Sequence, residues 1–356
     1  MSKVPFNRAE EMQIRGYSKE YIGFLGTKMA PTPKFNTPIS PKENVLRVYK
    51  KEQPLWAPSV VMDMNVIQPM CMPDAYARNY GGIDWFGIDW EFEPKSNAAM
   101  VRPGTRRLQD ICDWQEELVF PNLNDIDWEG YYNEHFKDVL DPDKATEFVI
   151  VNGCLERLAD LSSFEDALSW LLMEPEAVDE LFTKFTDFHI ELAKIAKEVF
   201  HTDVITFHDD LGTQRSPFVS KNVFDEVMYP HYKRMNDAIH EMGMYTNFHS
   251  CGNVDILLPG FIEAGFDSWE GQDNANDKLS QMERYGAELA HHSNFFFYEV
   301  LSDEELDKTL MGLIEGIGKT GRYISFMVPF VADPEFVTKV HTRYYELSRE
   351  YYCGKA

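Results

Sequence analysis

The second half of the chain alternates between short apolar stretches and amphipathic stretches, and this alternation constrains the fold more than any other feature. From about residue 146, strand-like stretches rich in β-branched and aromatic residues are each followed by a stretch with helical periodicity. The predicted strands cover residues 147–152, 203–207, 244–248, 266–269, 294–298 and 322–327. The predicted helices begin near Pro175 and cover residues 221–242, 254–263, 277–285, 303–318 and 333–351 after it.

Near-continuously apolar strands that alternate with helices are typical of a parallel sheet covered by helices. Six such units, together with an earlier buried strand over residues 57–64, predict an α/β fold of the (β/α)₈ TIM-barrel type. An open doubly wound sheet is the alternative, although no Gly-x-Gly-x-x-Gly follows the first strand as dinucleotide-binding folds require. We expect residues 1–356 to form a single barrel domain.

The first part of the chain departs from this regular pattern. Residues 7–24 have an apolar side and predict a helix, residues 30–42 predict a loop, and residues 41–51 predict a second helix. Residues 1–50 are therefore expected to be an N-terminal helical extension. Residues 80–130 are rich in Trp, Asp and Glu, and predict an elaborated excursion with strands and a hairpin.

The charge of the chain excludes two classes of partner. It has 34 Lys and Arg against 59 Asp and Glu, a formal net charge of −25, which argues against binding to nucleic acid or to an anionic membrane surface. The five cysteines are scattered, as is usual for free thiols in a reducing compartment. The N-terminal residues contain no apolar secretory signal, and no stretch approaches the ~18 apolar residues of a membrane span. We therefore expect a cytoplasmic protein.

The predicted strand over residues 244–248 ends in His249-Ser250-Cys251-Gly252. Side chains two residues apart on a strand point to the same side, so His249 and Cys251 face together. Imidazole and thiolate are ligands that Zn²⁺ prefers. On spacing alone, a packed cysteine beside a hydrogen-bonded histidine is more common than a metal site.

Polar residues gather where the predicted strands end, which is the catalytic edge of a barrel. Each has a structural alternative: Asp209 or Asp210 could cap a turn, His208 could be a structural histidine, and Glu270 could form a salt bridge. Their occurrence at one edge supplies the donors of a zinc site. The residues at this edge are Asp63, Asn65, His208, Asp209, Asp210, Gln214, His249, Cys251, Glu270, Gln272, Tyr298 and Glu299.

Other motifs give weaker indications. Met70-Cys71-Met72 could bind a soft metal, but core packing explains it as well. Arg102, Arg106 and Arg107 could bind an anion or form salt bridges in a loop. Neither a Gly-x-Ser-x-Gly nucleophile motif nor a phosphate-binding Walker loop occurs, and no spacing of carboxylates selects glycoside hydrolysis.

The second half of the chain resembles the uroporphyrinogen decarboxylase superfamily, and the likeness extends loosely over residues 50–350. The matching segments cover residues 208–214, 229–230, 242–244, 248–252 and 262–267. The resemblance implies a (β/α)₈ barrel. In the decarboxylase branch, arginines around the first strand hold the porphyrinogen carboxylates, whereas residues 54–64 contain no arginine.

The other branch of that superfamily contains corrinoid-dependent methyltransferases, whose His-x-Cys-Gly segment binds zinc. The resemblance therefore implies that His249 and Cys251 bind Zn²⁺. Coenzyme M methyltransferases add a second cysteine before the last helix, but residues 324–333 contain none. Glu270 is the first candidate for the third ligand because of its position at the edge, and Cys353 is a weaker candidate.

By this resemblance, the chain is expected to move a methyl group from a methoxylated or other methylated small molecule to the cobalt of a separate corrinoid protein, as in anaerobic O-demethylation. Zinc would act as a Lewis acid, and Asp210 or Glu270 could donate a proton. A decarboxylase acting on a porphyrinogen or a smaller acid is one alternative, and a non-catalytic barrel that binds a ligand or a corrinoid protein is another. The residues expected to contact substrate are Asp63, Asn65, His208, Gln214, Gln272 and Tyr298.

Overall fold

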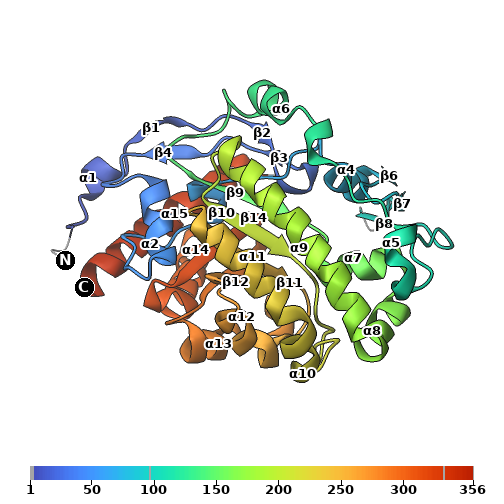
Figure 1. Ribbon diagram of the computed structural model, residues 1–356. Coiled ribbons are helices and arrows are strands. Elements are labelled where there is room, and N and C mark those ends of the chain that lie inside the picture. The colour runs from blue at the N-terminus through green and yellow to red at the C-terminus, as the bar shows by residue number, and fades with distance from the viewer. Residues whose placement is uncertain (1–3, 96–97, 332, 356) are drawn as a thin grey trace.

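Seven parallel strands form one curved sheet at the centre of the molecule, and helices surround it (Figure 1). The computed structural model describes residues 4–95, 98–331 and 333–355. Across the sheet the strands follow the order β14-β13-β12-β11-β10-β9-β5. Their bounds are β5 Met64–Ile67, β9 Ala145–Ile150, β10 Val204–His208, β11 Tyr245–Ser250, β12 Ser268–Gly271, β13 Ala290–Phe297 and β14 Tyr323–Pro329.

A short segment before β5 closes the sheet into a barrel. Ser59 pairs in parallel with Ser325 of β14, and the Ser325 amide donates a hydrogen bond to the Pro58 carbonyl at 2.9 Å. The few residues around Ser59 therefore occupy the place of the eighth strand between β14 and β5. The predicted α/β fold of (β/α)₈ type is confirmed, and the strands predicted from residue 146 onward lie within a few residues of the observed ones.

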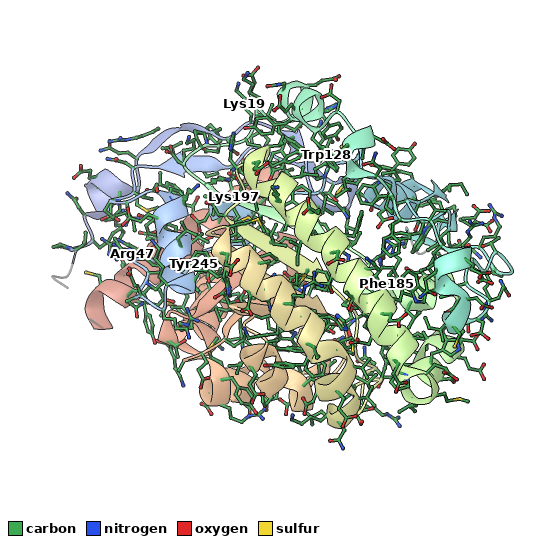
Figure 2. All side chains as sticks on the ribbon, in the orientation of Figure 1. Lys19, Arg47, Trp128, Phe185, Lys197 and Tyr245 are labelled. Carbon is green, nitrogen blue, oxygen red and sulfur yellow. The ribbon has the colours of Figure 1, made fainter. Side chains whose placement is uncertain are left out.

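The outer helices bury the largest apolar core against the outer face of the sheet. The phenylalanines of α9, among them Phe185 (labelled in Figure 2), pack between this helix and the segment that precedes β9. Ser302 caps α14 with a full capping box. The main helices of this layer are α7 Cys154–Leu161, α8 Phe164–Met173, α9 Pro175–Glu198, α11 Tyr229–Glu241, α12 Leu258–Glu263, α13 Lys278–Tyr285, α14 Asp303–Glu315 and α15 Pro334–Lys355.

Helix α2 (Pro41–Tyr49) closes the N-terminal end of the barrel. Its Val45, Val48 and Tyr49 are buried in one cluster with residues at the starts of several strands. The Tyr49 ring stacks on that of Tyr245, labelled in Figure 2, with ring centroids 5.2 Å apart. Arg47, on the same helix, lies away from this cluster and pairs with Glu43 at 3.0 Å.

The helix predicted over residues 7–24 is wrong for most of its length. Only α1 (Arg8–Glu11) is helical, and the strands β1 (Ile14–Tyr17), β2 (Tyr21–Ile22), β3 (Lys28–Met29) and β4 (Pro33–Phe35) follow it. β1 pairs with β4 and β2 with β3, both antiparallel. Gly26 adopts a φ of +61° in the turn between β2 and β3, a conformation that favours glycine. Pairing with distant residues therefore overrides the local helical pattern.

The strand predicted over residues 57–64 is also wrong in detail, and this changes the position of two predicted site residues. Residues Val60–Asp63 form one helical turn, α3, because the Asp63 carboxylate accepts the Ser59 amide at 2.7 Å. β5 begins only afterwards, at Met64. Asp63 and Asn65 therefore lie at the N-terminal end of the barrel, opposite the edge at which they were expected.

The elaborated excursion predicted near residues 80–130 is confirmed. It contains an antiparallel sheet of β6 (Gly82–Ile83), β7 (Asp89–Glu93) and β8 (Ala98–Val101), preceded by α4 (Pro73–Tyr80). The short helices α5 (Trp114–Glu117) and α6 (Trp128–His135) follow. In the part of the chain that the structure describes, none of the helices is both long and apolar enough to cross a membrane.

Candidate functional site

Four polar side chains form a row across neighbouring strands of the barrel. In the parallel register, His208 of β10 is opposite His249 of β11, which is opposite Glu270 of β12, which is opposite His292 of β13. Equivalent positions of adjacent strands point to the same face, so the sheet itself brings these residues together. The row lies toward the C-terminal ends of β10, β11 and β12, where chemistry occurs in this class of fold.

Two of these histidines are held by carboxylates in the same way. Nδ1 of His208 lies 2.7 Å from Oε2 of Glu156, and Nδ1 of His249 lies 3.0 Å from Oε1 of Glu270. The two imidazole rings stack with centroids 4.2 Å apart and planes 9° apart. A carboxylate on Nδ1 fixes the ring orientation and leaves Nε2 to bind a metal, which is the usual arrangement of metal-bound histidine.

Asp210 and Cys251 complete a set of donors on the Nε2 side of the rings. Oδ1 of Asp210 lies 4.0 Å from Nε2 of His208 and 3.9 Å from Nε2 of His249. Sγ of Cys251 lies 3.6 Å from Nε2 of His249. In a tetrahedral zinc site, ligand atoms are roughly 3.3 to 3.8 Å apart, given the usual Zn–N and Zn–S bond lengths. The ligand atoms of His208, Asp210 and His249 all lie within 4.8 Å of one another, close to this spacing, so these three donors fit Zn²⁺, and Cys251 lies next to them at His249.

A close crossing of two loops brings Asp210 to Cys251. Gly252 has a φ of +80°, and a Cβ at this position would lie 2.1 Å from the Gly212 backbone. The Cys251 amide donates a hydrogen bond to Oδ1 of Asp210 at 2.6 Å. Glycine at this position therefore allows the loop after β10 to pass directly against the loop after β11.

Asp209, next in sequence to Asp210, has a structural role. It is fully buried, and its carboxylate accepts the amides of Leu155 and Glu156 at 3.0 and 2.9 Å and the Tyr232 hydroxyl at 2.7 Å. Burial, with the nearby charge of Glu156, raises the pKa of Asp209 to about 8. Asp209 therefore stabilises the start of α7, and Asp210 is the carboxylate available for chemistry.

The charges of the two carboxylate–histidine pairs stabilise each other. Burial alone would raise the pKa of Glu156, but the charges of His208 and Arg78 outweigh it and lower the pKa to about 2. Burial would likewise raise the pKa of Glu270, but its contacts with His249 and His292 hold the pKa well below its usual value. Burial would lower the pKa of His249, but hydrogen bonds to Cys251 and Glu270 raise it well above its usual value.

Arg78 reaches this centre from α4, the helix that precedes the excursion, rather than from the barrel. Its Nη1 lies 3.6 Å from Oε1 of Glu156 and within hydrogen-bond reach of the Asn152 side chain. Its guanidinium also lies over the Trp90 ring of β7 in the excursion, 5.4 Å from the ring centroid. Helix α4 therefore supplies the cation that keeps Glu156 ionised beside His208.

A cavity of about 430 Å³ opens beside the two histidines. The turn between β2 and β3 lines one side of it, so the N-terminal segment covers the C-terminal part of the barrel interior. Among the described residues that line it, none is Lys or Arg. Its walls are mainly apolar and its polar residues lie together: the lining comprises Phe24, Leu25, Thr27, Met29, Val60, Val66, Glu147, Val149, Thr206, His208, His249, Glu270, Phe296, Phe326 and Phe330.

Glu147 of β9 is the buried acid of this cavity. Its carboxylate is hydrogen-bonded to the Thr206 hydroxyl, which in turn accepts the Asn247 amide at 3.1 Å. The Asn247 amide is also 3.5 Å from Oε2 of Glu270. Burial raises the pKa of Glu147, which favours its protonated form. The cavity thus contains a carboxyl group that can give up a proton next to the histidine centre.

Most residues predicted at the catalytic edge are found there. Oε1 of Gln272 accepts the Gly252 amide at 3.1 Å and the Gln214 side-chain amide at 3.2 Å, so this pair braces the loops around Cys251. Tyr298 is 73% exposed and stacks on Phe330 at the mouth of the cavity. Glu270, predicted as a metal ligand, contacts Nδ1 of His249, on the opposite side of the ring from the Asp210 and Cys251 donors.

Two residues of the centre, Glu156 and Glu147, were not identified from the sequence. Glu156 lies just after the predicted strand over residues 147–152. Collecting polar residues at the end of this strand, as was done for the other strands, would have found it. Glu147 begins that predicted strand, and an acid within an otherwise apolar strand was the available signal. Arg78 carries no signal in sequence, because only the packing of α4 against α7 brings it to Glu156.

A comparison with one solved structure supports this fold, and a second gives too low a score to bear on it. A methyltransferase from Methanosarcina mazei superposes with a TM-score of 0.61 at 14% identity, over 88% of this chain and 99% of that chain. A sugar phosphate isomerase/epimerase from Parabacteroides distasonis gives a TM-score of 0.33 at 13% identity, over 65% of this chain and 80% of that chain. No curated protein sequence matches at a significant level.

The sequence profile of one family matches the part of the chain that builds the histidine centre. The profile described as uroporphyrinogen decarboxylase (URO-D) aligns with residues 148–325, half of the chain. This span runs from β9 through β14 and includes Glu156, His208, Asp210, His249 and Cys251. The chain belongs to the uroporphyrinogen decarboxylase family.

Proposed function

We propose that the chain is a zinc-dependent methyltransferase that moves a methyl group from a methoxylated or other methylated small molecule to the cobalt of a separate corrinoid protein. The observation that carries this proposal is the pair of stacked histidines. Each is held at Nδ1 by a carboxylate and directs Nε2 toward Asp210, beside a cavity whose described lining contains no Lys or Arg. The fold of the Methanosarcina mazei methyltransferase supports the same class of reaction.

In this proposal, His208, Asp210 and His249 bind zinc, and Cys251 supplies the fourth donor. Glu156 and Glu270 then orient the two histidines from the Nδ1 side. The alternative, in which Glu270 is itself the third ligand as the sequence suggested, requires its carboxylate to leave Nδ1 of His249. Zinc bound here supplies a Lewis acid that stabilises negative charge on the oxygen of the departing group.

The cavity supports a neutral or cationic apolar substrate over an anionic one. Binding a carboxylate in a buried site needs a paired cation, and no Lys or Arg occurs among the described lining residues. Glu270, whose pKa is held well below its usual value, would instead repel an anion. This argues against a porphyrinogen with its carboxylates, although the family takes its name from that activity. The aromatic walls contributed by Phe24, Phe296 and Phe326 suit a methoxylated ring.

In the proposed transfer, the bond between the substrate oxygen and its methyl carbon breaks, and the oxygen keeps the electron pair. Glu147 is positioned to protonate that oxygen, because it lines the cavity and its burial favours the neutral acid. The reduced corrinoid partner supplies the nucleophile that accepts the methyl group. Apolar side chains at the mouth, among them Leu25, Phe296 and Phe330, are 39 to 60% exposed and give the partner a surface to contact.

Metal content and methyl transfer test the proposal together. We expect about one zinc per chain by mass spectrometry, lost in His249→Ala and in Cys251→Ser. With a reduced corrinoid protein as acceptor, the wild type should demethylate at least one neutral methoxylated aromatic compound, and both variants should be inactive.

Two matched variants test whether substituting any histidine or cysteine, rather than a predicted ligand, removes the zinc. His135→Ala and Cys112→Ser lie outside the centre on exposed parts of the excursion, and both should keep the zinc. A wild type that is purified reduced, with zinc supplied, and still contains no metal contradicts the proposal. Turnover of a porphyrinogen without any methyl transfer would favour a decarboxylase instead.

A further inference from the structure

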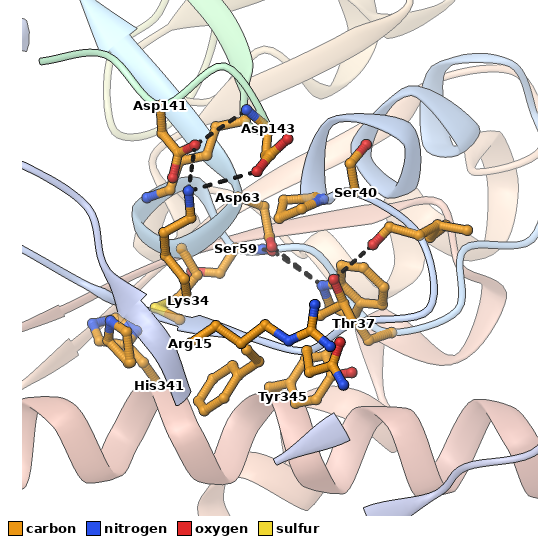
Figure 3. A pocket seen from close by; sticks show the side chains of 18 of the residues that line it. Arg15, Lys34, Thr37, Ser40, Ser59, Asp63, Asp141, Asp143, His341 and Tyr345 are labelled. Atoms are coloured by element: carbon orange, nitrogen blue, oxygen red, sulfur yellow. Dashed lines mark hydrogen bonds and ion pairs between the residues drawn. The ribbon is translucent and has the colours of Figure 1, made fainter. Parts of the chain in front are cut away.

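A second cavity, of about 600 Å³, lies at the opposite end of the barrel from the histidine centre (Figure 3). It is bounded by β1 and β4 of the N-terminal segment, the start of α2, the turn around α3, the loop before β9 and the final helix α15. Asp63 and Lys144, which precede β5 and β9, line it. Its volume falls within the range of sites that bind small metabolites.

Three of the residues that line this cavity have a buried polar atom without a hydrogen-bond partner among the described residues. These atoms are Nδ1 of His341, the hydroxyl of Ser59 and the hydroxyl of Tyr344. His341 is 3% exposed, Tyr344 2% and Ser59 1%. Buried polar groups are nearly always hydrogen-bonded, so unpartnered groups on several residues around one cavity point to a ligand with polar groups of its own.

The fixed charges around the cavity are compensated except at its mouth. The Asp63 carboxylate accepts the Ser59 amide at 2.7 Å and the Trp56 indole at 3.3 Å. Lys144 donates to the Thr32 hydroxyl at 3.0 Å and to the Val61 carbonyl at 3.2 Å. These contacts leave neither charged group exposed to solvent. At the outer edge, Lys34 pairs with Asp141 at 2.9 Å and lies 3.5 Å from Asp143.

Arg15 of β1 is the charge that remains. It is exposed and pairs with no acid among the described residues, and its guanidinium extends across the cavity in Figure 3. The start of α2, at Ser40 and Pro41, borders the same space, and helix starts favour negative charge. The mouth of the cavity thus favours an anion, while its buried end offers neutral hydrogen-bonding groups.

We propose that this cavity is a second ligand site, which binds a small hydroxylated metabolite carrying one carboxylate or phosphate. The anionic group contacts Arg15 at the mouth, and the hydroxyl groups satisfy Ser59 and His341. The site is separate from the histidine centre, so it does not depend on the zinc or the methyl transfer. A ligand there joins the N-terminal strands, the closure of the barrel at Ser59 and helix α15, and so stabilises the folded chain.

Glycerol 3-phosphate is the probe, because it carries both an anionic group and hydroxyl groups. Glycerol is the control that lacks the anionic group, and inorganic phosphate is the control that lacks the hydroxylated carbon chain. We expect millimolar glycerol 3-phosphate to raise the melting temperature of the wild type, glycerol to have no effect, and phosphate to bind more weakly. Calorimetric titration should give an affinity that falls about tenfold or more in Arg15→Ala, because a charge-assisted contact is lost. Ser59→Ala should weaken binding of glycerol 3-phosphate but not of phosphate.

Arg215→Ala is the matched control, since Arg215 is an exposed arginine in the loop after β10, at the other end of the barrel. This variant should bind the probe as the wild type does. Equal binding by wild type and Arg15→Ala would overturn the proposal, as would the absence of binding of all three probes by the wild type. Neither the Arg15 side chain nor the Ser59 hydroxyl forms a hydrogen bond or ion pair within the described chain, so neither variant should impair folding.

Discussion

The two ends of the barrel treat their buried histidines in opposite ways. At the C-terminal end, His208 and His249 each have a carboxylate on Nδ1, 2.7 and 3.0 Å away. At the N-terminal end, Nδ1 of His341 has no partner, and burial lowers its pKa to about 4. One end holds histidine–carboxylate pairs aimed at a common point, whereas the other holds a neutral ring beside an open cavity.

The difference shows that burial alone does not decide what a histidine does. Burial removes hydration at both ends, and the outcome depends on whether a carboxylate replaces the lost water. With a carboxylate, the ring is oriented and its free nitrogen is suited to a metal. Without one, the ring stays neutral and is suited to hydrogen bonding with a ligand. The predictions below test each half of this contrast.

The largest effect is expected from removing a predicted zinc ligand that sequence spacing did not single out. His208→Ala should weaken zinc binding by more than about a hundredfold, since an orienting carboxylate alone is worth 10- to 100-fold. Zinc titration against a competing chelator measures this affinity. Asp63→Asn, at the opposite end, should leave the affinity unchanged. Equal zinc affinity in wild type and His208→Ala would exclude His208 from the ligand set.

Removing the buried acid of the catalytic cavity should slow the reaction without removing the metal. Glu147→Gln keeps the shape of the side chain but cannot donate the proton, so kcat for demethylation should fall about a hundredfold. Zinc content should stay at the wild-type level, because Glu147 contacts Thr206 rather than the zinc donors. If Glu147→Gln demethylates a methoxylated substrate with the wild-type kcat, another group supplies the proton to the substrate oxygen.

The orienting carboxylates should have a smaller effect on zinc affinity than the ligands. Glu156→Gln should weaken zinc binding about 10- to 100-fold by freeing the His208 ring. Glu270→Gln should do the same through His249, if Glu270 orients the histidine. A complete loss of zinc in Glu270→Gln, larger than in Glu156→Gln, would instead identify Glu270 as a direct ligand.

The smallest effect concerns the neutral histidine at the N-terminal end. The folded pKa of His341 is about 4, below the usual value of 6.5, so the unfolded chain binds the proton more tightly. Its contribution to stability is therefore complete above pH 6.5 and is lost as the pH falls toward 4. Between pH 7.5 and 5.5 this amounts to about 1 kcal/mol.

Chemical denaturation at the two pH values measures that loss. His341→Gln does not titrate in this range, so its free energy of unfolding should fall by about 1 kcal/mol less than that of the wild type. His135→Gln, at an exposed position away from this end of the barrel, is the control substitution. An identical pH dependence in His341→Gln and wild type would mean that His341 is not held neutral by the fold.

Local sequence patterns were sufficient where strands and helices are regular. The apolar strands from β9 to β14 and their helices were found within a few residues, because alternation of buried strands and amphipathic helices is a local property. The same regularity placed His208, Asp210, His249 and Cys251 at one edge. The patterns failed over residues 7–24 and 57–64, where antiparallel pairing and the Asp63–Ser59 hydrogen bond impose another structure.

The sequence by itself determined that strand ends would bring imidazole, thiolate and carboxylate groups to one edge of a barrel, since this follows from strand periodicity. Only the tertiary structure decided which nitrogen of each histidine is free. Glu156 and Arg78 come from segments far from His208 in sequence, and Glu270 faces His249 because of the parallel register. The second cavity is likewise a tertiary feature, because Arg15, Ser59 and His341 meet only where the two ends of the chain pack together.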